Sequence, residues 1–295
     1  MRALGRALGF GVACVLVASA LVVALGRGGE ERGAGPSGQG GPDPVSVADV
    51  ELPLRREWGG LSCVSLDRIR RVQSPRAQGR WAYEIRIEDG DTPTTENERC
   101  ELTQGTGYRL PGTSVAAGTR QFAEGDERWI AFQVRVGAEW DAETDLFNNF
   151  MQLKNDGSGG PPLKMAIDEG RIELGGIDDP ERSSPNFVTL WSTRFTPAHR
   201  DRWLKILLHV RFSPDEEEGW VALYGDLGEG GVVPLLRRTS LPTMKIDDDE
   251  AIAVHPRIGI YRDRDVSGEA RVWFDGYTVA RSREAAERVA FAPGA

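Results

Sequence analysis

The stretch Trp203–Phe212, WLKILLHVRF, decides the fold class of this chain. If it is extended, successive side chains point to opposite faces. One face then carries Leu204, Ile206, Leu208, Val210 and Phe212. A period of two over this length is typical of a β-strand with at least one buried face, and it does not fit a helix.

The same period recurs along the chain. It predicts further strands at Arg80–Glu88, Trp129–Val136, Leu163–Asp168, Arg171–Leu174, Gly219–Tyr224 and Arg271–Ala280. Glu169-Gly170 is a hairpin signal between two of them, and only Ser282–Val289 has a helical pattern. We therefore predict an all-β jelly roll, a concanavalin A-like sandwich of two antiparallel sheets. One sheet of such a fold often curves and offers a groove to an extended ligand.

The ends of the 295-residue chain differ from its middle. Residues 1–27 join two arginines to an apolar run, which is typical of a signal peptide or an N-terminal membrane anchor. Residues 28–45 are rich in Gly, Pro and Ser and are expected to form a flexible linker. Residues 46–281 would form the jelly-roll domain and 282–295 a C-terminal tail. We expect a secreted or extracellular monomer, whose only contact with a membrane would be a tether through its N-terminal segment.

The cysteines and the net charge limit which covalent cross-links, partners and cofactors can be expected. Cys63 and Cys100 are the only cysteines after the N-terminal segment, and in an exported protein they are expected to form a disulfide. Closing this loop of about 38 residues would contribute roughly 3 to 4 kcal/mol. The net charge of −9 argues against a nucleic acid partner. No metal-binding spacing is visible, so we expect no cofactor, with structural calcium at acidic turns as the one option.

The stretch Ala253–Arg264, AVHPRIGIYRDR, contains the first candidate site residues. As a strand it places His255, Arg257, Gly259 and Tyr261 on one face. A cation and a phenol then stand on either side of a glycine that would leave room for something to approach.

Two other predicted strands carry polar residues in a similar way. In Glu96–Leu102, Arg99 and Glu101 share a face and Cys100 points the other way. Strict alternation in Asn148–Lys154 gives one face with Asn148, Phe150, Gln152 and Lys154, and an opposite face with Asn149, Met151 and Leu153.

In this chain order the three segments resemble the jelly-roll alginate lyases, and related arrangements occur in the heparin lyase-like and glucuronan lyase-like groups. Those lyases carry R-x-E, then Q-x-H, then a strand ending K-A-G-x-Y. The matching pieces here are Arg99-Cys-Glu101, Gln152-Leu-Lys154 and Arg257-Ile-Gly259-Ile-Tyr261, followed by a similar closing strand, Val272–Val279. The resemblance covers roughly residues 63–280.

The resemblance implies β-elimination on a uronate-containing, acidic polysaccharide. Arg99 and Gln152 would neutralise the C5 carboxylate, and Glu101 would orient Arg99. Tyr261 would be the acid, or both acid and base, if a neighbouring cation such as Arg257 lowers its pKa from about 10.

One position departs from the pattern of those lyases. Where they have a histidine as a candidate base, this chain has Lys154. A lysine acts as a base only if burial lowers its pKa from about 10.4; otherwise Lys154 would only bind carboxylate. His255 is the one histidine that could take its place.

Two other functions remain open from the sequence. A carbohydrate-binding module of the same fold would bind without cleaving. A retaining glycoside hydrolase would need paired carboxylates, which the acidic segment Glu139–Asp145, EWDAETD, could offer. Trp140 within that segment is either a platform for a sugar ring or an ordinary edge aromatic.

Overall fold

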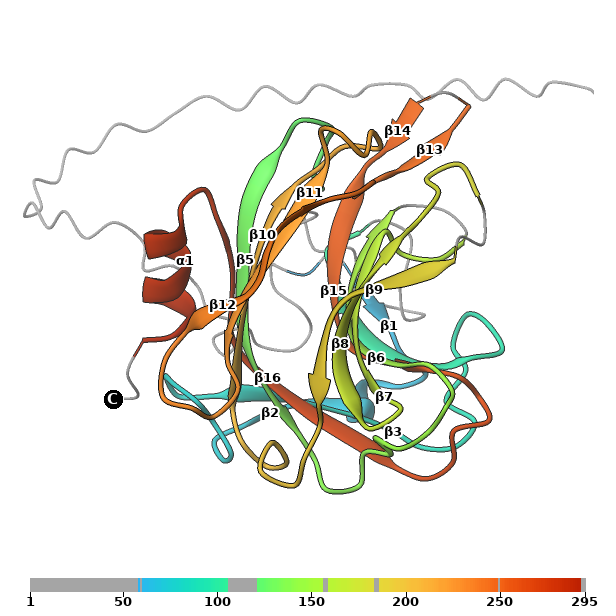
Figure 1. Ribbon diagram of the computed structural model, residues 1–295. Helices are drawn as coiled ribbons and strands as arrows, with labels where there is room; N and C mark the ends of the chain where they lie inside the picture. Colours follow the sequence, from blue (N-terminus) through green and yellow to red (C-terminus); the bar gives the residue numbers. More distant parts are fainter. Residues whose placement is uncertain are drawn as a thin grey trace, which may run out of the picture. The chain divides into compact units, whose positions relative to one another are not determined.

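Two seven-stranded antiparallel sheets pack face to face in the computed structural model (Figure 1). The structure describes residues 58, 60–105, 121–155, 159–182, 186–248 and 250–292. The sheet that we call the front sheet has the order β1 (Gly60–Ser62), β4 (Glu98–Thr103), β15 (Val254–Arg262), β6 (Asn148–Asn155), β7 (Leu163–Asp168), β8 (Arg171–Ile177) and β9 (Phe187–Arg194).

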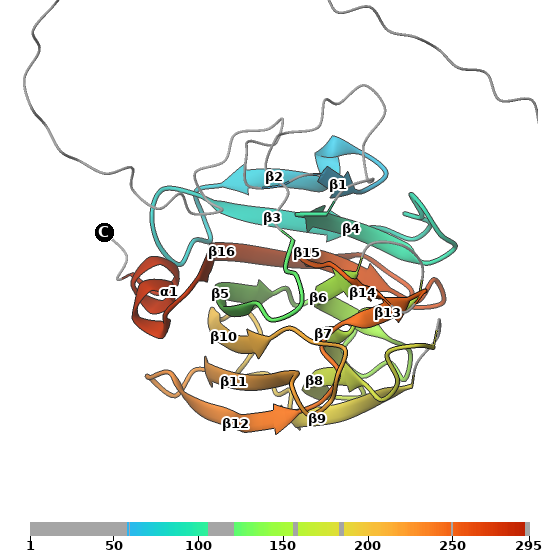
Figure 2. The ribbon, with the colours of Figure 1, turned by 90° about the horizontal axis from the view of Figure 1, so that it is seen from above.

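The back sheet has the order β12 (Val233–Ser240), β11 (Trp220–Asp226), β10 (Leu204–Arg211), β5 (Glu127–Val136), β16 (Ala270–Ala280), β3 (Ala82–Ile87) and β2 (Ile69–Val72). A short hairpin of β13 (Lys245–Asp247) and β14 (Glu250–Ile252) and a 3₁₀ turn, η2 (Leu66–Arg68), complete the strand-rich part. Figure 2 shows the two sheets from above, with strands that are distant in sequence lying side by side in each. The prediction of an all-β jelly-roll sandwich is confirmed.

The core lies between the sheets and follows the predicted alternation. The inward residues of β10 (Leu204, Ile206, Leu208 and Val210) and Phe212 just beyond it are all at most 2% exposed. The predicted hairpin is also confirmed, because Glu169 and Gly170 both have positive φ (47° and 67°), as a two-residue type I′ turn requires.

Helix α1 (Arg283–Ala290) packs on the outer face of the back sheet. The Ser282 side chain accepts a hydrogen bond from the backbone N–H of Ala285, which caps the helix start. Ala286 and Ala290 contact Ala131 and Leu207. The helix predicted from the C-terminal pattern is therefore confirmed, and it buries Leu207, which points away from the main core.

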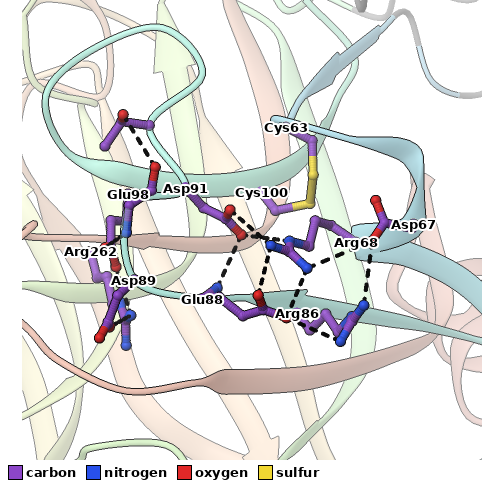
Figure 3. A network of polar contacts seen from close by, with 12 residues as sticks. Cys63, Asp67, Arg68, Arg86, Glu88, Asp89, Asp91, Glu98, Cys100 and Arg262 are labelled. Atoms are coloured by element: carbon purple, nitrogen blue, oxygen red, sulfur yellow. Dashed lines mark hydrogen bonds and ion pairs between the residues drawn. A yellow bond between two sulfur atoms is a disulfide. The ribbon is translucent and has the colours of Figure 1, made fainter.

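The predicted disulfide between Cys63 and Cys100 is confirmed, and it ties the loop after β1 to β4 (Figure 3). Two arginines in ion pairs lie nearby. Arg68 donates to Asp91 (2.7 Å) and Glu88 (2.8 Å). The Nε of Arg262, which is 1% exposed, donates to Glu98 (2.7 Å). These ion pairs hold the ends of β3, β4 and β15 together.

The predicted signal peptide or anchor (1–27) and linker (28–45) lie outside the described residues. Within the described part of the chain, no helix is long and apolar enough to cross a membrane.

Candidate functional site

The three segments that the sequence singled out are neighbouring strands of the front sheet, in the order β4–β15–β6. Arg99 pairs with Tyr261, and Gln152 with Arg257. Lys154 pairs with His255. Ile258, Ile260 and Cys100 belong to the core, so the polar residues that alternate with them point to the outer face of the front sheet.

A β-bulge in β6 changes which asparagine lies on this outer face. Between Asn149 and Met151 the pairing with β7 slips by one residue, and Phe150 turns inward and joins the core. Asn149 therefore pairs with Tyr261 and shares the outer face with Gln152 and Lys154. The prediction that Asn148 and Phe150 lie on that face is wrong, because strict alternation does not continue through a bulge.

Gly259 makes room for the neighbouring strand and not for a ligand. Its φ is +146°, and a Cβ at this position would lie 2.2 Å from the carbonyl oxygen of Cys100. Any side chain here would push β15 away from β4. The glycine therefore explains how closely Tyr261 can approach Arg99.

Glu101 is the only acidic side chain among these outer-face residues of β4, β15 and β6, and three partners surround it. Gln152 donates its amide N–H to Glu101. The Nε of Arg99 lies 3.5 Å and the Nη1 of Arg257 3.8 Å from the same carboxylate. All four side chains are almost fully buried, so one negative charge holds two arginines and an amide in fixed positions.

Tyr261 is the more accessible member of the group. It is half-buried, whereas its neighbours in the row are buried. The guanidinium of Arg99 lies 3.8 Å from the centre of the phenol ring, and Asn97 donates to the hydroxyl oxygen at 3.4 Å. Phe147 packs against the ring on another side, with centroids 5.0 Å apart. These contacts fix the ring while leaving part of it exposed.

Burial lowers the pKa values of two paired residues at one end of the site, Lys154 and His255. Burial, followed by the positive charges of Arg257 and Lys245, lowers the pKa of Lys154 to about 7. Its ammonium donates to the backbone and side-chain oxygens of Asn155. Burial, followed by the charge of Arg257, lowers the pKa of His255 to about 3, so this imidazole is neutral at physiological pH.

His255 also has a defined hydrogen-bond role. Its Nε2 accepts a hydrogen bond from the Nε of Arg257 at 3.1 Å, and it is fully buried. A Cβ on Gly105 would lie 2.3 Å from the same nitrogen. The lone pair that a base would need is therefore committed to Arg257.

Lys154 and Tyr261 stand at opposite ends of the group. Lys154 pairs with His255, which is six positions from Tyr261 along β15. At about 3.3 Å per residue this separates the two backbone positions by roughly 15 to 20 Å. The bonds to Asn155 also direct the ammonium away from Tyr261. At this separation no single sugar ring could touch both side chains.

The first two carboxylates of the acidic segment Glu139–Asp145 are engaged in local contacts. Glu139 forms an ion pair with Arg271 (3.2 Å), and Asp141 accepts from the backbone of Glu143. Trp140 is buried and donates from its indole nitrogen to the carbonyl of Ile167. The interpretation of Trp140 as a sugar platform or an edge aromatic is wrong, because it packs in the core.

No group of three or more His, Cys, Asp or Glu side chains in the described ranges is arranged to hold a metal ion. The expectation that the chain works without a cofactor stays a prediction.

Comparison with known proteins gives one strong match. The model of a family described as polysaccharide lyase matches residues 54–278. No curated protein matches the chain.

Solved structures with related folds were also found. They include the family 7 alginate lyase A1-II′ (11% identity, TM-score 0.47, 69% of this chain and 81% of that chain). Another is the family 7 alginate lyase AlyA1 from Zobellia galactanivorans (14%, 0.39, 68% and 77%). A third is a GH131 β-glucanase catalytic domain from Podospora anserina (11%, 0.48, 82% and 93%).

Proposed function

This chain belongs to the polysaccharide lyase family, and from that premise we propose that it cleaves a uronate-containing, acidic polysaccharide by β-elimination outside the cytoplasm. The observation that carries the proposal is the arrangement on β4, β15 and β6. Tyr261 lies in one row with Arg99, whose guanidinium stacks on the phenol ring. The neighbouring side chains on this face include more cations than carboxylates.

The charge of the site suits a polyanionic ligand. Arg99, Arg257 and Lys154 face one carboxylate, Glu101, although the whole chain carries a net charge of −9. A local excess of positive charge attracts an anionic chain regardless of the overall charge. Uronate carboxylates are such anions, and arginine binds them through paired hydrogen bonds.

In the proposed reaction Tyr261 carries the proton. The cycle starts from the Tyr261 phenolate, whose oxygen takes the proton from C5 of the uronate. The C4–O4 bond breaks as a double bond forms between C4 and C5, and the same proton passes from the phenol to O4, which regenerates the phenolate. Arg99 places a positive charge against the ring and so stabilises the phenolate from which the cycle starts and to which it returns. Because the proton moves from C5 to O4, the tyrosine returns to its starting state and no redox cofactor is needed.

Lys154 and Arg257 are assigned to binding a neighbouring sugar. Their distance along the strands from Tyr261 favours contact with the carboxylate of the next residue of the chain over contact with the same C5. We do not assign the base to His255, because its Nε2 already accepts from Arg257.

The test is incubation of the protein with alginate, glucuronan and heparin while the absorbance of unsaturated uronate is followed. Tyr261→Phe is expected to lower kcat by about 10²- to 10⁴-fold and to leave polysaccharide affinity nearly unchanged. Tyr224→Phe, on the back sheet, is the matched control and should behave as the wild type.

Three other outcomes would contradict the proposal. Lysis that survives Tyr261→Phe refutes the role of Tyr261. Reducing ends that appear without the new absorbance indicate a glycoside hydrolase. Binding with no product from any of the three polymers indicates a carbohydrate-binding module.

A further inference from the structure

The hairpin formed by β2 and β3, residues 69–87, concentrates positive charge on a chain whose net charge is −9. It carries five arginines and a single carboxylate, Glu84, which is buried and pairs with Arg70 at 2.6 Å. For three of these arginines, no carboxylate among the described residues lies within ion-pair distance. We call these three the hairpin arginines; they are Arg71, Arg76 and Arg80.

The hairpin arginines are accessible hydrogen-bond donors. Arg76 and Arg80 are exposed, and Arg71 is partly exposed. The guanidinium groups of Arg71 and Arg80 lie 5.1 Å and 6.0 Å from the centre of the Trp81 ring, which is itself partly exposed. A partly exposed indole beside two guanidinium groups offers a ligand both an apolar face and charge-assisted hydrogen bonds.

A hollow opens beside the loop of this hairpin. Its lining consists of residues 73–78, which include Arg76, together with Arg135 and Trp203. No carboxylate is among these lining residues. Arg135 pairs with the exposed Asp201 at 3.0 Å, and Trp203 is partly exposed. The hollow therefore combines two cations with an aromatic ring.

The loop that forms one wall of the hollow is held in a fixed conformation. The carboxylate of Asp275 accepts hydrogen bonds from the backbone N–H groups of Ala77 and Gln78, each at 2.9 Å. The side-chain amide of Gln78 donates to the carbonyl of Val289 in α1 at 2.8 Å. Because the backbone is already ordered, a ligand would bind here at little cost in conformational entropy.

We propose that the β2–β3 hairpin and the hollow beside it form a second binding site for the uronate polysaccharide. This inference rests on the proposed function for the identity of the polymer, and it adds a surface that holds the chain without cleaving it. Guanidinium groups bind carboxylates through paired hydrogen bonds, and a local excess of positive charge attracts a polyanion. Trp81 and Trp203 supply apolar faces for sugar rings.

The second site faces away from the candidate active site. Arg135 alternates with the core residue Val134, so the hollow opens on the outer face of the back sheet. Tyr261 lies on the outer face of the front sheet, and the two sheets stack about 10 Å apart. A tetrasaccharide bound over Tyr261 therefore does not reach the hairpin, whereas another segment of a long polymer does. Binding at the hairpin raises the concentration of polymer at the front sheet.

The test compares long and short substrates of the full chain. The hairpin variant, Arg71→Gln/Arg76→Gln/Arg80→Gln, removes three charges without breaking an ion pair among the described residues. Its KM for whichever of alginate, glucuronan and heparin is cleaved should rise about tenfold, with kcat unchanged. Its KM for tetrasaccharides prepared from the same polymer should stay within about twofold of the wild-type value.

The control variant makes the same change of charge at three exposed arginines elsewhere on the chain. It is Arg182→Gln/Arg194→Gln/Arg237→Gln, and it should keep the wild-type KM for both substrate lengths. The inference is wrong, and the proposed function stands, if the hairpin variant keeps the wild-type KM for the polymer. The same conclusion follows if the control variant raises this KM equally, or if the hairpin variant raises the KM for tetrasaccharides as much as for the polymer.

Electrophoresis in gels that contain one of the three polymers measures binding independently of cleavage. The two variants have the same net charge, so stronger retardation of the control variant than of the hairpin variant supports the second site. If this result comes without cleavage of any polymer, the inference stands and the proposed reaction is wrong. Equal retardation of both variants, or retardation of the wild type by inorganic polyphosphate and by none of the uronate polymers, overturns the inference. If the wild type is neither retarded nor active, both proposals are wrong.

Discussion

Replacing Lys154 by methionine should stabilise the protein, and by an amount that depends on pH. Lys154 is 7% exposed, and burial with neighbouring cations lowers its pKa from the ordinary 10.5 to about 7. Between these two values the unfolded chain binds a proton that the folded chain does not. Wild-type stability therefore rises with pH through this window, and below about pH 7 the native state bears the full cost of the buried charge.

The magnitude follows from the same two values. By linkage, a lysine with a pKa of about 7 in the fold and 10.5 in the unfolded chain destabilises the native state by about 5 kcal/mol at pH 6 and about 2 kcal/mol at pH 9. Losing the bonds from Lys154 to Asn155 offsets part of this gain by about 1 kcal/mol each. That offset is the same at both pH values, so the difference of about 3 kcal/mol between them isolates the charge.

Urea unfolding of the wild type and Lys154→Met at pH 6 and pH 9, followed by tryptophan fluorescence, measures this difference. The advantage of the variant should shrink by about 3 kcal/mol from pH 6 to pH 9, which is 1 M or more in midpoint. Lys205→Met, at a lysine whose side chain is 34% exposed, is the control and should show little dependence on pH. An advantage for Lys154→Met that is constant or grows with pH would refute the reasoning.

Three further predictions test other parts of the structure. Raising the pH from 6 to 8 should increase KM for a uronate polymer with kcat little changed, because Lys154 loses its charge near pH 7; a kcat that rises through pH 7 would instead assign Lys154 as the base. The double variant Cys63→Ser/Cys100→Ser should lose about 3 to 4 kcal/mol of unfolding free energy, measured by urea titration, and an unchanged midpoint would contradict this. Arg262→Met should cost about 3 to 5 kcal/mol by leaving Glu98 unpaired, and adding Glu98→Leu should restore most of that loss in a double-mutant cycle.

Much of the fold follows from the sequence because both sheets bury one face. The alternation of apolar and polar residues predicted β3, β5, β7, β10 and β16, with ends that differ from the observed ones by a few residues at most. The edge strands β9 and β12 were not predicted, because most of their side chains are at least partly exposed and no apolar face repeats along them. Each of them is hydrogen-bonded to a neighbouring strand along one edge only, so its sequence shows little alternation of apolar and polar residues.

The candidate site was predictable as a set of segments but not in its chemistry. The order of motifs brought Arg99, Gln152 and Tyr261 onto adjacent strands. The lowered pKa of Lys154 depends first on burial and then on the charges of Arg257 and Lys245, which lie on other strands, so no local pattern could reveal it. Asn149 was placed inward because NNFMQLK reads as an uninterrupted alternation, and nothing in those letters marks a bulge.

The bulge in β6 also determines how this chain can be aligned with its relatives. A one-residue difference in length between Asn149 and Gln152 exchanges the faces of every residue on one side of it. Phe150 is the extra residue of the bulge, so a relative that lacks it would keep the residue aligned with Asn149 on the outer face by plain alternation. A relative of the same length without the bulge would place the residue aligned with Asn148 there instead. Between members of this family, the presence of the bulge and the placement of a gap at Phe150 therefore decide which of the two asparagine positions is matched on the outer face.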